Sequence, residues 1–138
     1  MKGDLYINGT DAWDHGIEMG RGFVDALGAS LSFKEDIAND SALEHGRRLV
    51  LSRFVEAREL SLIFNIHGAD EESFLANDRW LLSVFYAREL TVQVRGDENV
   101  YRLVYTGRST SYAHRPSGLF CIRAAKFLEP NPGERGEK

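Results

Sequence analysis

The clearest pattern along the chain is an alternation of apolar and polar residues over positions 60–67. Successive side chains of a strand point to opposite faces of a sheet, so this pattern predicts a strand with one strongly apolar face. The residues of that face are Leu60, Leu62, Phe64 and Ile66. We expect Leu49 to Val55 to be its antiparallel partner, joined to it by a turn at Glu56-Ala57-Arg58.

A helical pattern follows this strand. Asp70 is a candidate N-cap, and Glu71 and Glu72 stand where the positive end of a helix dipole favours carboxylates. Apolar residues then recur at helical spacing, with Trp80 and Tyr86 beside them: Phe74, Leu75, Leu81, Leu82 and Phe85. We expect one amphipathic helix to about Arg88 that packs its apolar face on a sheet.

Two further strands are expected at Leu90 to Arg95 and Val100 to Thr106, joined by the turn Gly96-Asp97-Glu98-Asn99. Every second residue of the later strand is large and apolar, namely Tyr101, Leu103 and Tyr105. We expect Gly107 to Gly118 to be a polar connection. A last long strand, Leu119 to Leu128, is expected after it.

The two ends of the chain are less regular. Asp4 to Ile7 and Trp13 to Met19 read as short strands near the N-terminus, and Pro130 to Gly133 ends the last strand. We expect residues 133–138 to be a disordered tail.

The elements together predict a single domain over residues 1–132 of the α+β class, mainly β. Its architecture is expected to be a β-sandwich or a partly closed barrel with one amphipathic helix packed against it.

Residues 20–46 form a long connection without a regular period. Connections longer than about 15 residues are usually functional or disordered, so we interpret this one as an arm. It carries six apolar residues that a solvated linker would not need: Phe23, Leu27, Leu31, Phe33, Ile37 and Leu43. We therefore expect it to mediate self-assembly.

The arm is followed by the most basic stretch of the chain, which includes Arg47 and Arg48. These arginines could meet a phosphate or a carboxylate of another chain, and solvated charges before a strand are the alternative interpretation. The candidate subunit interface comprises Ile37, Leu43, Arg47 and Arg48.

Composition and charge exclude several classes of function. The 138 residues carry a net charge of only −4, so there is no overall field to attract nucleic acid. No apolar run approaches the 18 or so residues of a membrane span, and no segment resembles a secretory signal. The single cysteine, Cys121, excludes an internal disulfide and fits a reducing compartment, so cytoplasmic synthesis is expected.

The residues suited to catalysis or metal binding do not form a motif. The four histidines have no metal-type spacing, and Asp70 and Glu71 near His67 are explained by the helix start. Cys121 lies between Phe120 and Ile122, where a thiol is usually a small buried apolar group. We expect no catalytic, metal or cofactor site, and no enzyme.

The order of elements resembles the tail-tube and distal-tail proteins of long-tailed bacteriophages. The resemblance is carried by Arg58 to Gly68 with the acidic helix start after it, by the strands from Leu90 to Thr106, and by the closing Lys126 to Pro132. The stretch from Glu35 to Arg48 is similar to phage-derived tail proteins encoded, as prophage, in genomes of gut bacteria.

This resemblance implies a virion structural protein that joins edge to edge into hexameric rings. Its partners would be copies of itself and other tail proteins, with no nucleic acid and no membrane. It would be made in the cytoplasm and located in the virion tail after assembly. The chain is short for a distal-tail protein, and we expect it to lack that family's second domain.

Two other classes of function remain open. A small-ligand or carbohydrate-binding β module could use Trp13, Tyr105, Tyr112 and the hydroxyl-rich run Ser109-Thr110-Ser111. A small enzyme could assemble its site from residues too scattered to form a motif. A binding module requires a concave apolar pocket with a few polar groups, whereas an assembly protein requires a large contact between copies.

Overall fold

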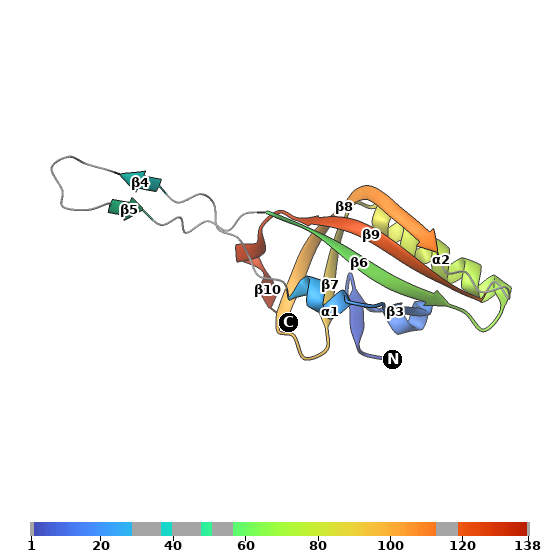
Figure 1. Cartoon of the computed structure of the whole chain (residues 1–138). Coiled ribbons are helices and arrows are strands. Elements are labelled where there is room, and N and C mark those ends of the chain that lie inside the picture. The colour runs from blue at the N-terminus through green and yellow to red at the C-terminus, as the bar shows by residue number, and fades with distance from the viewer. Residues whose placement is uncertain (1, 29–36, 40–47, 51–56, 113–118, 138) are drawn as a thin grey trace.

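The computed structural model describes residues 2–28, 37–39, 48–50, 57–112 and 119–137. The strands of its large sheet are β1 (Leu5–Ile7), β2 (Thr10–Asp11), β3 (Ile17–Met19), β6 (Arg58–His67), β7 (Glu89–Val94), β8 (Asn99–Tyr112), β9 (Phe120–Glu129) and β10 (Gly136–Glu137). They follow the order β2-β1-β7-β8-β9-β6-β3, with β10 added to β8, and curl into a half-barrel (Figure 1). The mainly β, α+β fold is confirmed, in its partly closed form.

The remaining described elements are two α-helices, two 3-10 helices and a separate pair of strands. They are α1 (Phe23–Leu27), α2 (Glu71–Tyr86), η1 (Ala12–His15), η2 (Pro132–Glu134), β4 (Ile37–Asn39) and β5 (Arg48–Val50). β4 and β5 pair with each other and not with the large sheet. In the part of the chain that the structure describes, no helix is long and apolar enough to cross a membrane.

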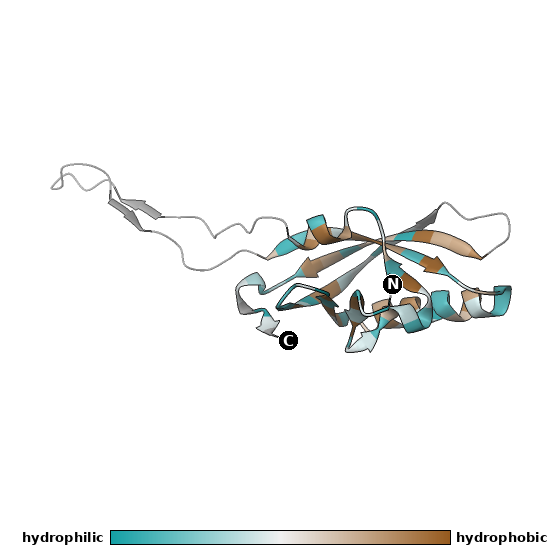
Figure 2. Cartoon of the chain, turned by 90° about the horizontal axis from the view of Figure 1, so that it is seen from below, coloured by the Kyte–Doolittle hydropathy of each residue, from teal (hydrophilic) through white to brown (hydrophobic). Residues whose placement is uncertain are grey.

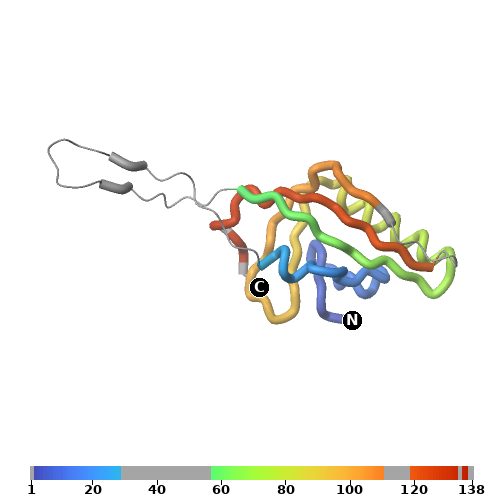
Figure 3. Tube along the Cα trace, in the orientation of Figure 1, coloured from blue at the N-terminus to red at the C-terminus, as the bar shows by residue number. Residues whose placement is uncertain are grey.

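β6 and β9 form the longest ladder of the sheet, from Arg58 opposite Glu129 to His67 opposite Phe120. Figure 3 traces the two strands side by side along the body. The alternation predicted for β6 is confirmed, because its four apolar residues are all buried. The hairpin with Leu49 to Val55 is wrong where it is described, because Leu49 and Val50 pair with β4 and the long partner of β6 is β9. Residues 51–55 lie outside the described part, and Arg58 belongs to the strand rather than to a turn.

α2 begins as predicted. The Asp70 carboxylate accepts a 2.7 Å hydrogen bond from the backbone N–H of Ser73, which satisfies a helix donor that has no partner within the helix. The helix ends at Tyr86, and Arg88 takes a left-handed conformation (φ 73°) with its backbone C=O accepting from the Tyr105 N–H at 2.7 Å. This bond ties the end of the helix to β8.

The apolar face of α2 was predicted in part, and Tyr86, expected beside it, is 70% exposed. Phe74, Leu81 and Phe85 are buried and Leu82 is half-buried against the core, but Leu75 is 43% exposed. Val84 is buried in its place, because it lies one turn from Leu81 on the side that faces the sheet.

Aromatic rings fill the centre of the core between α2 and the sheet. The Phe64 ring lies 5.2 Å from Phe23 and 5.6 Å from Phe85, and Phe85 stacks on Tyr105 at 5.0 Å between centroids. Tilted and offset contacts of this kind are the arrangement that aromatic quadrupoles favour. Along the strands, hydrophobic and hydrophilic segments alternate, as expected for a sheet with one face on a core (Figure 2).

The predicted hairpin of β7 and β8 is confirmed, but β8 is longer than expected. It continues to Tyr112, so the first part of the predicted polar connection from Gly107 is strand. Tyr105 pairs with Phe127 and Ser109 pairs with Ala125, so β8 advances by four residues where β9 advances by two. The extra residues of β8 form a bulge. Gly107 supplies the positive φ (85°) that the bulge requires. Residues 113–118 lie outside the described part.

A segment predicted as irregular is folded onto the core, and a predicted strand is partly helical. The connection starting at Gly20 opens with α1, and its Phe23 and Leu27 are only 1% and 2% exposed, so these two belong to the protein's own core and are not available to a partner. Glycines on both sides of this short helix made it read as a loop. Likewise, Trp13 to His15 belong to η1, and only Ile17–Met19 forms a strand.

The C-terminal tail is also ordered where it is described. We expected disorder from residue 133, but β10 pairs with β8, with Gly136 opposite Val100 and Glu137 opposite Asn99. Arg135 holds this segment through a buried carboxylate, as shown below.

Replacement of Leu81 by alanine is expected to destabilise the fold by about 2 to 5 kcal/mol, because its side chain is fully buried beneath the sheet. Leu82→Ala is expected to cost less, and Leu75→Ala, at an exposed position of the same helix, less than about 1 kcal/mol. Urea unfolding followed by circular dichroism measures all three. Equal small effects at Leu81 and Leu75 would contradict the packing described here.

Candidate functional site

One arginine holds the end of α1 beside the start of β6, and residues 29–57 connect these two places in sequence. The Arg58 guanidinium donates to the backbone carbonyls of Ala26 at 3.3 Å and Leu27 at 2.8 Å. Arg58 itself is the first residue of β6. The two ends of the long excursion between Gly28 and Arg58 are therefore fixed side by side, at what we call the base of the excursion.

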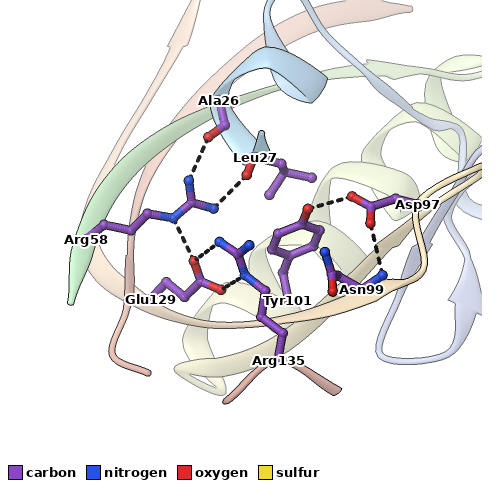
Figure 4. Close-up of polar contacts among 8 residues, drawn as sticks. All are labelled: Ala26, Leu27, Arg58, Asp97, Asn99, Tyr101, Glu129 and Arg135. Atoms are coloured by element: carbon purple, nitrogen blue, oxygen red, sulfur yellow. Dashed lines mark hydrogen bonds and ion pairs between the residues drawn. The ribbon is translucent and has the colours of Figure 1, made fainter. Parts of the chain in front are cut away.

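Glu129 lies at the centre of this base. Its side chain is only 1% exposed, and its Oε1 accepts from Arg58 Nε at 2.6 Å. Arg135 donates from Nε and Nη2 to the two carboxylate oxygens at 2.9 and 3.0 Å (Figure 4). The carboxylate thus joins β9, β6 and the C-terminal segment, and through Arg58 it also holds α1.

The two arginines determine the charge of this carboxylate. Burial by itself would raise the Glu129 pKa, but the hydrogen bonds and charges of Arg135 and Arg58 outweigh it and hold the pKa below its ordinary value of 4.5. The same hydrogen bond raises the pKa of Arg135. The group is thus an ionised, fully paired triad at neutral pH.

Tyr101 extends the base toward the turn between β7 and β8. The Arg135 guanidinium lies over the Tyr101 ring, 4.7 Å from its centroid, and the Tyr101 hydroxyl donates to Asp97 in that turn. Burial, together with the bond to Asp97, raises the Tyr101 pKa. The turn, the C-terminal segment and the base are therefore one connected polar network (Figure 4).

The residues predicted for a subunit interface are only partly described. Ile37 starts β4, and Arg48 starts β5 opposite Asn39. Leu43 and Arg47 lie outside the described residues. The interface assignment therefore stays a prediction.

Sequence analysis did not identify Arg58, Glu129 or Arg135. A signal was present for two of them: Arg58 stands two residues before Leu60, and Glu129 two residues after Phe127, so both continue the apolar face of their strands. A charged residue at such a position requires an opposite charge within reach. No sequence signal indicates Arg135, whose place depends on the path of the C-terminal segment.

A groove of about 640 Å³ opens beside the base. Apolar side chains line it from β3, α1 and β7, and acidic residues with one arginine line it at the N-terminus and at the β7–β8 turn: Met19, Val24, Leu27 and Val94, then Asp4, Arg95, Asp97 and Glu98. Val24 is 55% exposed there, although the other face of α1 is buried. The groove is thus apolar inside with a mainly acidic edge.

The residues proposed for a carbohydrate site do not come together. Tyr105 is buried in the core, stacked on Phe85, and its hydroxyl donates to Ser109 Oγ at 2.8 Å. Trp13 instead lies by His67, with 5.2 Å between ring centroids. The side chain of Tyr112 is outside the described part.

Within the described residues, no three side chains of histidine, cysteine, aspartate or glutamate gather to hold a metal ion. His15 stacks flat on Trp80 at 4.0 Å, and the Nε2 atom of His67 lies 3.5 Å from Glu18 Oε1. Cys121 is buried in β9, in agreement with its predicted packing role.

The lowered Glu129 pKa predicts a pH dependence of stability. A depressed carboxyl pKa stabilises the fold above the unfolded-state value, near 4.5, and this contribution is lost as the pH falls through the folded-state pKa. Glu129→Gln is expected to cost about 3 to 5 kcal/mol at pH 7, with the gap to the intact protein narrowing below about pH 4.5. Urea unfolding from pH 7 to pH 3 measures the gap, with Glu89→Gln as the exposed control. A gap that is independent of pH would contradict the ionised triad.

No protein-family model matches this sequence, and no curated protein matches it either. Among solved structures, the fold is similar to the Dit protein (gp 19.1) of phage SPP1, described as a paradigm of the hub adsorption apparatus in phages that infect Gram-positive bacteria. The TM-score is 0.57 at 17% sequence identity, over 94% of this chain and 50% of the Dit chain. The chain therefore has the fold of about half of Dit.

Proposed function

We propose that this protein is a structural protein of a phage or prophage tail, of the distal-tail kind, that assembles with copies of itself into a hexameric ring. The observation that carries the proposal is the similarity of nearly the whole chain to the Dit fold. Other tail proteins would contact the ring above and below, and the site of action would be the virion tail.

The edges of the sheet support assembly. Beyond the bulge, the described pairings of β8 from Ser109 to Tyr112 are with β9 alone, since β7 pairs only with Tyr101 to Val104. On the other side of the sheet, β3 pairs with β6 only from Phe64 to Ile66. Backbone groups at such edges can pair with a strand of another chain, which is how a partly closed sheet extends into an assembly.

The base of the excursion supports the arm interpretation. Arg58, Glu129 and Arg135 fix the two ends of the segment from Gly28 to Arg58, so whatever the segment contacts is connected to a rigid anchor. A rigid anchor reduces the ordering cost of binding. The β4–β5 pair within the segment also lacks a place in the large sheet.

The proposal is tested by the mass of the protein in solution at two concentrations a hundredfold apart, combined with negative-stain images. We expect a mass near six chains, and ring-shaped particles, at the higher concentration. A monomer at every concentration, including after addition of the neighbouring tail proteins, would contradict it.

A deletion tests the role of the arm. Replacement of residues 34–44 by a short glycine linker removes β4 and leaves every described core residue in place, so we expect an unchanged unfolding midpoint and a loss of ring formation. Calorimetry and sedimentation measure the two effects. A shortened protein that stays folded and still forms the same rings would show that the arm is not required.

A further inference from the structure

We propose that a pocket beside the bulge of β8 binds a small zwitterion, that is, a compound with an oxyanion and an ammonium group. The pocket has a volume of about 430 Å³ and is lined by residues of β6, β8 and β9. This volume lies in the range of small-molecule sites. The inference goes beyond the proposed function and does not depend on ring formation, because a single chain supplies the whole pocket.

The pocket lies on the face of the sheet that points away from the core, which we call the outer face. Leu60 of β6 and Phe127 of β9 are paired partners and are both buried. Successive side chains of a strand point to opposite faces, so the exposed Glu59, Ser61 and Lys126 point outward. Two tightly paired strands therefore form the floor of the pocket, and polar side chains stand on it.

The bulge of β8 forms the remaining wall of the pocket and is fixed on both faces of the sheet. Thr106 and Arg108 line the pocket where β8 loses its register with β9. On the core side, the Tyr105 hydroxyl donates to Ser109 Oγ at 2.8 Å. On the outer side, the Thr106 hydroxyl donates to the backbone carbonyl of Lys126 at 3.0 Å. The wall is thus formed before a ligand binds, which reduces the ordering cost of binding.

The charged side chains of the pocket are available to a ligand. Arg108, Lys126 and Glu59 are all exposed, and within the part of the chain that the structure describes no ion pair engages them. An arginine fork and a lysine ammonium are the side chains that bind phosphate and carboxylate oxygens most strongly. The two cations can therefore hold an oxyanion together.

The single carboxylate determines the other end of the ligand. Glu59 pairs directly with Leu128, so it stands diagonally across the β6–β9 ladder from Lys126. Diagonal neighbours on one face of a sheet lie about 7 to 8 Å apart. Glu59 would repel a simple anion, but it attracts an ammonium group that lies a few bonds from the oxyanion. The Ser61 hydroxyl, opposite Lys126, can donate a further hydrogen bond to the oxyanion.

Titrations of the isotope-labelled chain, followed by nuclear magnetic resonance at low salt, test the proposal. O-phosphoethanolamine carries both groups, β-alanine has a carboxylate in place of the phosphate, and inorganic phosphate and ethanolamine each carry one group. We expect O-phosphoethanolamine to shift the amide signals of Arg108 and Lys126, with a dissociation constant about tenfold below that of inorganic phosphate. Ethanolamine alone should bind more weakly than either.

Variants separate the two ends of the ligand. Arg108→Gln should weaken O-phosphoethanolamine and inorganic phosphate alike, each about fivefold, because it removes one charged contact to the oxyanion. Glu59→Gln should weaken only O-phosphoethanolamine, so that its advantage over inorganic phosphate disappears. Arg79→Gln makes the same charge change as Arg108→Gln at an exposed position of α2 and should change neither affinity. Thermal unfolding confirms that each variant is folded, and Lys126→Gln takes the place of Arg108→Gln if that variant is unstable.

Each outcome decides a part of the proposal. Binding of β-alanine as tight as that of O-phosphoethanolamine would support the pocket and identify a carboxylate as its oxyanion, whereas weaker binding would identify a phosphate. No saturable shift at Arg108 and Lys126 with any probe, or equal affinities in Arg108→Gln and the intact chain, would overturn the site. Inorganic phosphate that binds as tightly as O-phosphoethanolamine, or an unchanged preference in Glu59→Gln, would overturn the zwitterion and leave only an anion attracted by surface charge.

Discussion

The buried carboxylate of Glu129 is the constraint on which the closed end of the half-barrel depends. A carboxylate that is 1% exposed is tolerated only when it is paired, and leaving it without a partner would cost several kcal/mol. Arg58 and Arg135 satisfy it from two different segments, and Arg58 then uses its remaining donors on α1. One acidic side chain therefore determines where three parts of the chain meet: the start of β6, the end of α1 and the C-terminal segment. These parts surround the place where the long excursion departs, so the same interaction that closes the core also anchors the excursion.

The regular parts of the fold could be predicted because their signals are local. Alternation identified β6, the cap at Asp70 identified the start of α2, and the turn at Gly96 to Asn99 identified the β7–β8 hairpin. The pairing of distant strands was harder to predict, because the apolar face of β6 is compatible with any strand that has a matching apolar face. Leu49 to Val55 was the nearest candidate in sequence, whereas the strand that pairs is β9, more than fifty residues later. α1 and β10 were missed for a different reason: both are too short to show a period, and both are held by contacts made elsewhere in the chain.

In the candidate site, too, some features could be predicted from the sequence and others could not. The excursion was visible in the sequence as a long aperiodic stretch with apolar residues, but two of the six, Phe23 and Leu27, complete the core of their own chain. The residues that anchor it were not visible, since Arg58 and Arg135 look like ordinary surface arginines until Glu129 is known to be buried between them. Composition cannot supply that information. The role of a charged residue on an apolar face depends on its partner, and for Arg58 that partner lies 71 positions away in the sequence. The groove was missed likewise, as its lining comes from four separate segments.

The groove and the base of the excursion share two residues. Leu27 lines the groove while its backbone carbonyl accepts from Arg58, so one residue belongs to both places. Asp97 has a similar double position, since it lines the groove and also accepts from Tyr101 beneath Arg135. Coupling between two places needs a shared physical element of this kind. A change in the groove that displaces either residue would therefore also act on the triad that holds β6, α1 and the C-terminal segment together.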